Sequence, residues 1–173
     1  MELHIRSNKM LLYKKDSVPA DSAAIICSSY PVNEERFDWL PLKLILYFDD
    51  ITDARRPCAF TTKISKAICD FVVANENKNL YICCDSGESR SAAIAAAICR
   101  SMEIDEMWVW RSPHYHPNPL VYKIQCESFG MPVRKEEIAE LRRINAKALA
   151  AAVTASRIRV GNNNNGMDDG GSK

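Results

Sequence analysis

Residues 80–91 hold the strongest structural signal in the chain: they read Leu80-Tyr81-Ile82-Cys83-Cys84-Asp85-Ser86-Gly87-Glu88-Ser89-Arg90-Ser91. An apolar strand enters this stretch, and an alanine-rich helix over 92–98 leaves it. A short loop between a buried strand and the start of a helix directs several consecutive backbone N–H groups toward one point. Such a concavity binds an oxyanion.

The residue types in this loop suit nucleophilic chemistry on a bound phosphate. Arg90 falls at the expected helix start, where its planar guanidinium can hold two oxygens at once. Gly87 lies mid-loop, where the missing Cβ permits a positive φ and a close approach of the backbone to the ligand. The N–H groups, the helix dipole and Arg90 all favour a negative sulfur, so we expect Cys84 to be nucleophilic near neutral pH. Ser91 can then donate a hydrogen bond to that sulfur when it leaves.

The spacing Cys-x5-Arg is weak evidence by itself, because Cys84 could be one of several buried free cysteines and Arg90 an ordinary helix-start cation. The apolar strand before the pattern and the apolar helix after it favour the functional interpretation. The run Cys84-Asp85-Ser86-Gly87-Glu88-Ser89-Arg90-Ser91-Ala92-Ala93 resembles the phosphate-binding loop of the cysteine-based protein tyrosine phosphatases, in the compact dual-specificity-like branch with microbial members. The order of elements resembles that family over roughly residues 20–130.

The resemblance implies an α/β fold of three layers, in which helices flank a mostly parallel central sheet. It also implies a phosphocysteine intermediate on Cys84, a phosphate clamped by Arg90, and no metal or other cofactor. The chain departs from the family at Cys83, where the family usually has His. The substrate-binding residues that the resemblance implies are Asp85, Ser86, Gly87, Glu88, Ser89, Arg90 and Ser91.

A phosphatase of this kind also needs a proton donor for the leaving oxygen, and the family supplies an Asp from a separate upstream loop. The apolar run 44–48 predicts a strand, and Asp49, Asp50 and Asp53 follow at its end, where functional loops of parallel sheets gather. We choose Asp50 as the general acid, because it comes just past the strand. Asp53 fits the family's usual spacing slightly better, and Asp49 could oppose ionisation of a neighbouring carboxylate. The alternative is that these residues form a turn and cap the next helix.

Strands are predicted over 23–27, 43–48 and 80–83, with a helix capped by Thr61 or Thr62 between the last two. This order predicts parallel pairing with right-handed crossovers. We expect a single domain over 1–160, including a C-terminal helix over 135–158 that packs on the domain. The alternative is that this helix extends and pairs with another chain. The Asn- and Gly-rich residues 161–173 are expected to be disordered.

The composition of the chain is typical of a small cytoplasmic enzyme. It has 173 residues, of which 47% are hydrophobic, enough for one domain with its own core. The formal net charge of +1 does not indicate nucleic-acid or membrane partners. The N-terminus lacks the apolar segment of a secretory signal, and seven cysteines without a paired framework predict a reducing compartment.

Two segments after the loop carry weaker signals. His114-Tyr115-His116 is an isolated histidine cluster, for which a surface or packing turn is the default interpretation over a metal site. The segment 117–122 is similar to one that follows the catalytic helix in microbial members of the phosphatase group. We assign Asn118 no catalytic role there, although it could support the phosphate loop by a hydrogen bond.

The acidic residues Asp85 and Glu88 bear on the class of substrate that we expect. Lipid phosphatases of this superfamily resemble one another in carrying lysines in the loop, whereas two acidic residues here argue against highly anionic ligands. RNA-directed relatives tend to follow the arginine with Thr-Gly, and this chain has Ser91-Ala92. We therefore expect a phosphoprotein phosphatase acting on phosphotyrosine or with dual specificity. The alternatives are a catalytically weak phosphopeptide-binding pseudophosphatase and a sulfur-transfer enzyme with a persulfide on Cys84.

Overall fold

The fold is built on a four-stranded parallel sheet, described by a computed structural model that covers the backbone of residues 1–164 and the side-chain surroundings of 1–156. The strands lie in the order β1-β4-β2-β3, and each neighbouring pair is parallel. The two central strands are buried along their whole length, as expected when helices cover both faces of a parallel sheet. The strand bounds are β1 Leu3–Ser7, β2 Ala23–Ser28, β3 Leu42–Tyr47 and β4 Leu80–Cys84.

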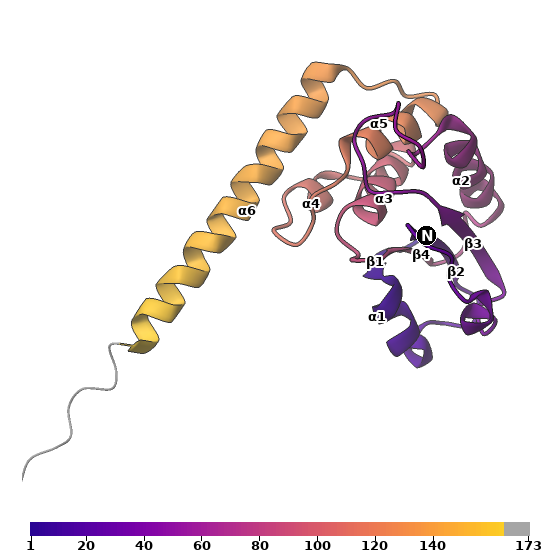
Figure 1. Cartoon of the computed structure of the whole chain (residues 1–173), viewed down its shortest axis with the longest axis horizontal. Coiled ribbons are helices and arrows are strands. Elements are labelled where there is room, and N and C mark those ends of the chain that lie inside the picture. Colours follow the sequence, from indigo (N-terminus) through magenta and orange to yellow (C-terminus); the bar gives the residue numbers. More distant parts are fainter. Residues whose placement is uncertain (165–173) are drawn as a thin grey trace, which may run out of the picture.

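Helices cover both faces of the sheet and give the predicted three-layer α/β architecture (Figure 1). One face carries α2 (Thr62–Ala74), α3 (Arg90–Ser101) and α5 (Pro119–Ser128). The opposite face is covered by α1 (Asn8–Tyr13), by Val18 directly after the 3-10 turn Lys15–Ser17, and by Phe37 of the 3-10 turn Glu34–Phe37. The fold class predicted from the sequence is thus confirmed, and Thr61 caps α2 by accepting a hydrogen bond from the N–H of Ile64.

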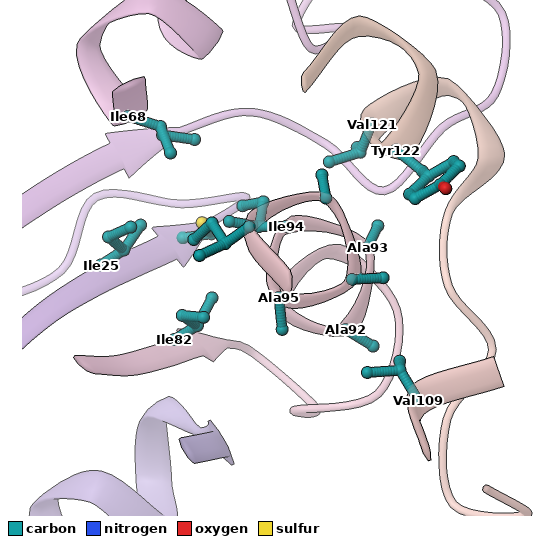
Figure 2. Close-up of a cluster of buried hydrophobic side chains, with 14 of the residues drawn as sticks. Ile25, Ile68, Ile82, Ala92, Ala93, Ile94, Ala95, Val109, Val121 and Tyr122 are labelled. Carbon is teal, nitrogen blue, oxygen red and sulfur yellow. The ribbon is translucent and has the colours of Figure 1, made fainter. Parts of the chain in front are cut away.

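Helix α3 is the centre of the core, because it is surrounded on every side. Each residue from Ala92 to Cys99 has no exposed surface. In Figure 2, side chains of this helix face Ile25 and Ile82 of the sheet on one side, and Val121 and Tyr122 of α5 on another. The small alanine side chains allow the sheet and α5 to lie close to the helix axis, which holds the N-terminus of α3 in a fixed position at the end of β4.

The first strand and helix were not predicted from the sequence. β1 lies at an edge of the sheet and pairs with β4 in a register that sets Ser7 beside Cys84. Ser7 then caps α1 by accepting a hydrogen bond from the N–H of Met10. The sequence pattern that indicates β1 is the alternation of Leu3 and Ile5 with polar residues. This pattern is weak, because the strand has five residues and all of them are only half-buried.

The C-terminal helix α6 (Lys135–Asn164) starts at the predicted residue and runs past the predicted end at 158. Residues 161–164 were expected to be disordered, and the helix instead continues through them, since extending an existing helix adds one hydrogen bond per residue. The rest of that expectation, for 165–173, lies outside the described residues. Asn145 docks α6 by donating to the carbonyls of Trp110, Ser112 and Tyr115.

A membrane-spanning helix is absent from the part of the chain that the structure covers. None of the helices within residues 1–164 combines the length and the apolar composition needed to cross a bilayer.

Candidate active site

The Cys84 thiol lies at the carboxyl end of β4, beneath the loop that leads to α3. Its side chain is 1% exposed. The N–H of Gly87 points at the sulfur over 3.3 Å, and the Oγ of Ser91 lies 3.1 Å from it. Two groups that can donate to a thiolate therefore surround Cys84, one from the loop and one from the first turn of α3.

The preceding residue, Cys83, points to the opposite face of the sheet, as alternation along a strand requires. It is fully buried in the cluster that contains Leu11 and Phe37, and burial raises the pKa of its thiol. The two adjacent thiols thus have different surroundings: Cys83 is packed among apolar side chains, whereas Cys84 faces the polar loop.

Gly87 adopts the backbone conformation that the sequence predicted, with φ at +78°. A Cβ at this position would lie 2.4 Å from the backbone nitrogen of Ser7 and 2.6 Å from the carbonyl carbon of Arg6. Glycine is therefore required here both for the positive φ and for packing of the loop against β1. The edge strand β1, which was not predicted from the sequence, thus packs directly against the loop between β4 and α3.

Arg90 is 4% exposed, and three acceptors fix its guanidinium. Nη1 donates to the carbonyl of Phe48 at 2.8 Å and to Ser29 Oγ at 3.1 Å, and Nη2 donates to Asp85 at 2.6 Å. Its Nε is buried and has no hydrogen-bond partner among the residues described. A buried donor without an acceptor costs about 1–3 kcal/mol, which a bound oxyanion would remove.

Asp85 accepts hydrogen bonds from several directions. Besides Arg90, its carboxylate receives Ser28 Oγ at 3.1 Å, the Ser29 N–H at 3.2 Å and Asn8 Nδ2 at 3.2 Å. Partial burial by itself raises the pKa of Asp85, but the hydrogen bonds from Arg90 and Ser29 outweigh it and hold the pKa below its ordinary value. Asp85 is therefore a partner of Arg90, and its negative charge offsets part of the positive charge that Arg90 brings to the loop.

The start of α3 leaves its first N–H groups without a side-chain cap. Ser89 occupies the capping position but makes no capping hydrogen bond. Its Oγ donates instead to Asp50 Oδ1 at 2.8 Å. The N–H groups at this helix start, which carry the positive end of the helix dipole, are then available to an anion in the loop.

Of the three aspartates after β3, Asp50 contacts the phosphate loop. Its Oδ1 accepts from Ser89 Oγ and from Asn118 Nδ2, the latter at 2.7 Å. Asp53 pairs with Arg55 at 2.9 Å on the surface, and this hydrogen bond lowers the pKa of its carboxyl. The backbone N–H of Asp49 donates to the carbonyl of Cys58 within the same loop. The geometry brings Asp50, and not its neighbours, to the loop that holds Cys84 and Arg90.

Asn118 and the histidine turn brace the loop from the other side. Asn118 caps α5 with its carbonyl oxygen and uses its amide to hold both Asp50 and the carbonyl of Ile51. His116 Nε2 lies 3.3 Å from the carboxylate of Glu88, and the His116 N–H donates to the Glu88 carbonyl at 3.0 Å. Asn118 is thus part of the site, whereas the sequence suggested for it only a supporting hydrogen bond to the loop. Its capping position after Pro117 was the available signal.

The remaining loop residues predicted to bind substrate lie at its outer edge. Ser86 and Glu88 line a cavity of about 450 Å³ together with β1, α1 and residues 113–116. Among the described residues, no group of three or more His, Cys, Asp or Glu side chains is placed to hold a metal ion.

Comparison with known proteins gives a likeness in fold. No family model matches the chain, and no curated protein matches its sequence. A crystal structure of PTPMT1 in complex with PI(5)P is similar with a TM-score of 0.43 and 14% identity, over 87% of this chain and 94% of that one. A second crystal structure of PTPMT1 gives a TM-score of 0.41 and 14% identity over 88% and 95%. A likeness this distant concerns the arrangement of strands and helices and carries no information on chemistry.

Proposed function

We propose that this protein is a phosphatase that hydrolyses phosphate monoesters of proteins through a phosphocysteine intermediate on Cys84. The observation that carries the proposal is the buried, unpartnered Nε of Arg90 at the same helix start as the Cys84 thiol. A thiol nucleophile and an unsatisfied cationic donor around one uncapped helix N-terminus suit a tetrahedral oxyanion.

The chemistry would proceed in two displacements. The Cys84 sulfur attacks phosphorus, the bond from phosphorus to the substrate oxygen breaks, and Asp50 gives its proton to that leaving oxygen. Arg90 and the loop N–H groups would hold the phosphoryl oxygens through the transition state. Water then attacks phosphorus, Asp50 takes a proton from it, and the Cys84 thiolate leaves with a hydrogen bond from Ser91.

A phosphoprotein, with phosphotyrosine or dual specificity, is the proposed substrate, and a reducing cytoplasm is the proposed compartment. The free state of all seven cysteines fits that compartment. The second candidate is a pseudophosphatase that binds phosphopeptides without hydrolysing them. It is favoured by the engagement of Arg90 Nη2 with Asp85, which leaves fewer guanidinium donors for the transition state.

The test is hydrolysis of an aryl phosphate in the presence of a chelator and a reductant, comparing the unmodified chain with Cys84→Ser. Cys83→Ser is the matched control, since it removes the neighbouring thiol on the other face of the sheet. We expect activity that survives the chelator, persists in Cys83→Ser and is lost in Cys84→Ser. If the unmodified chain binds vanadate but turns nothing over, the pseudophosphatase candidate replaces the enzyme. If it does neither, both candidates fail.

A further inference from the structure

A second cavity, separate from the thiol, opens beside the phosphate loop on the side of Asp85. Its volume is about 520 Å³, within the range of pockets that hold a side chain or a small ligand. Three parts of the chain that are distant in sequence meet there: α1, the segment after β2 and the phosphate loop. The lining residues are Asn8, Lys9, Leu12, Pro31, Val32, Asn33, Arg36, Phe37 and Asp85.

The cavity has an apolar base and a cationic rim. Phe37 is 2% exposed, and Leu12 and Val32 are half-buried around it. Lys9 and Arg36 line the same cavity and are exposed, and neither takes part in an ion pair among the described residues. Although Glu34 and Glu35 lie in the same turn as Arg36, the two cations make no ion pair of their own and can pair with an incoming carboxylate.

Asp85, the sole acidic residue of this lining, is paired with Arg90, so the pair as a whole adds little net charge beside the two cations. Asp85 directly follows Cys84 in the chain, so the cavity borders the same loop that holds the proposed nucleophile. In an extended peptide successive residues advance by about 3.3 Å, so residues that flank a phosphorylated residue bound to this loop lie on the scale of the loop itself.

We propose that the cavity is a specificity subsite that binds an acidic side chain flanking the phosphorylated residue of a protein substrate. The proposal rests on the proposed function and adds to it the chemistry of the substrate sequence. The carboxylate of a flanking Glu or Asp would meet Lys9 and Arg36 at the rim, and its methylene groups would cover the apolar base. Asn8, which lines the cavity and donates to Asp85, links the subsite directly to the phosphate loop.

The experiment measures kcat/KM for three phosphotyrosine peptides that are identical except for Glu, Gln or Lys on both sides of the phosphotyrosine. The unmodified chain should prefer the Glu peptide over the Gln peptide roughly fivefold, and added salt should reduce that ratio. In the double variant Lys9→Glu and Arg36→Glu, the Glu to Gln ratio should fall below one, and the Lys peptide should become the best substrate. Because each variant is judged by the ratio of its own kcat/KM values, a general loss of activity or of folded protein cancels.

The matched control is Lys66→Glu with Lys135→Glu, which makes the same change in net charge at exposed positions that line none of the cavities described. This control should keep the original preference. Equal kcat/KM values for all three peptides on the unmodified chain would overturn the subsite while leaving the phosphatase intact. Faster hydrolysis of a soluble phosphoinositide with two phosphates, lost in the cavity variant, would assign the cavity to a second phosphate instead. Absence of aryl phosphate hydrolysis would instead count against the proposed function itself.

Discussion

The loop that links β4 to α3 and the loop that holds Asp50 are held in place by very different means. Residues 84–91 lie between two buried elements, β4 and α3, and Arg90 is fixed by three hydrogen-bond acceptors at nine-tenths burial or more. Asp50 lies in an exposed loop and is held by two donors, Ser89 and Asn118, on one carboxylate oxygen. The proposed nucleophile Cys84 and the proposed clamp Arg90 are therefore part of the buried core, whereas the proposed acid Asp50 depends on a few local contacts. Changes in the first region should affect both activity and stability, and changes in the second should affect activity alone.

The largest effect is expected from Arg90→Lys. A lysine keeps the charge but loses the planar fork and the Nε donor, so kcat should fall by about a thousandfold. The carbonyl of Phe48 and the carboxylate of Asp85 also lose their donors, so the free energy of unfolding should decrease. Urea unfolding and aryl phosphate turnover measure the two losses. A variant that loses neither would place the phosphate clamp elsewhere.

Asp50→Asn tests the loop that holds Asp50, which is the more exposed of the two loops. Removal of the proposed proton donor should lower kcat by about a hundredfold and leave the urea midpoint near its original value. Asp53→Asn is the matched control, because Asp53 lies in the same loop but pairs with Arg55. If Asp53→Asn gives the larger loss in kcat, the acid role passes to Asp53.

Asn118→Ser tests how far the position of Asp50 depends on the hydrogen bond that it accepts from Asn118. Serine retains a capping oxygen for α5 but is too short to donate to Asp50 as the Asn118 amide does at 2.7 Å. We expect kcat to fall roughly tenfold with KM little changed, because a misplaced acid slows the chemical step. An equal effect on hydrolysis of a substrate whose leaving group needs no proton would show a merely structural role for Asn118.

The smallest effect concerns Asp85 and the pH dependence of stability. Its pKa in the folded protein lies below the ordinary value of 3.8. The stabilisation is therefore complete above that pH and is lost as the pH falls through the folded-state pKa. Asp85→Asn should be less stable than the unmodified chain at neutral pH by less than about 1 kcal/mol, since this side chain is partly exposed. Urea unfolding at neutral pH and near pH 3 should show that difference shrinking in acid.

Most of the fold could be predicted because its central elements are strongly patterned. The runs at 23–27 and 80–83 are continuously apolar, and α3 is apolar on all sides, so their types followed from hydrophobicity alone. The half-buried edge strand β1 lacked that signal. The end of α6 was placed too early because Gly and Asn are poor helix formers, while the helix was already established before them.

The candidate site was predictable only where it is local in sequence. Cys84, Gly87, Arg90 and Ser91 lie within eight residues, so the strand, loop and helix signals that surround them were sufficient. The choice among Asp49, Asp50 and Asp53 rested on position after a strand, and the contacts that single out Asp50 come from Ser89 and Asn118. The hydrogen bonds of Asp85 were not predicted, because its partner Arg90 and the donors Ser28, Ser29 and Asn8 meet it only in the folded chain.

The sequence by itself determined the parallel α/β class and the pairing of a thiol with an arginine across one loop. Both follow from short-range patterns: apolar periodicity, and a strand that turns directly into a helix. Only the tertiary structure decided which aspartate meets the loop, where Asp85 directs its charge, and that Lys9 and Arg36 border a cavity beside it. Apart from the Asp85–Arg90 pair, which spans five positions, those relations join residues that lie tens of positions apart. They exist only once the packing of β1, α1 and α5 around the sheet has fixed the distances between them.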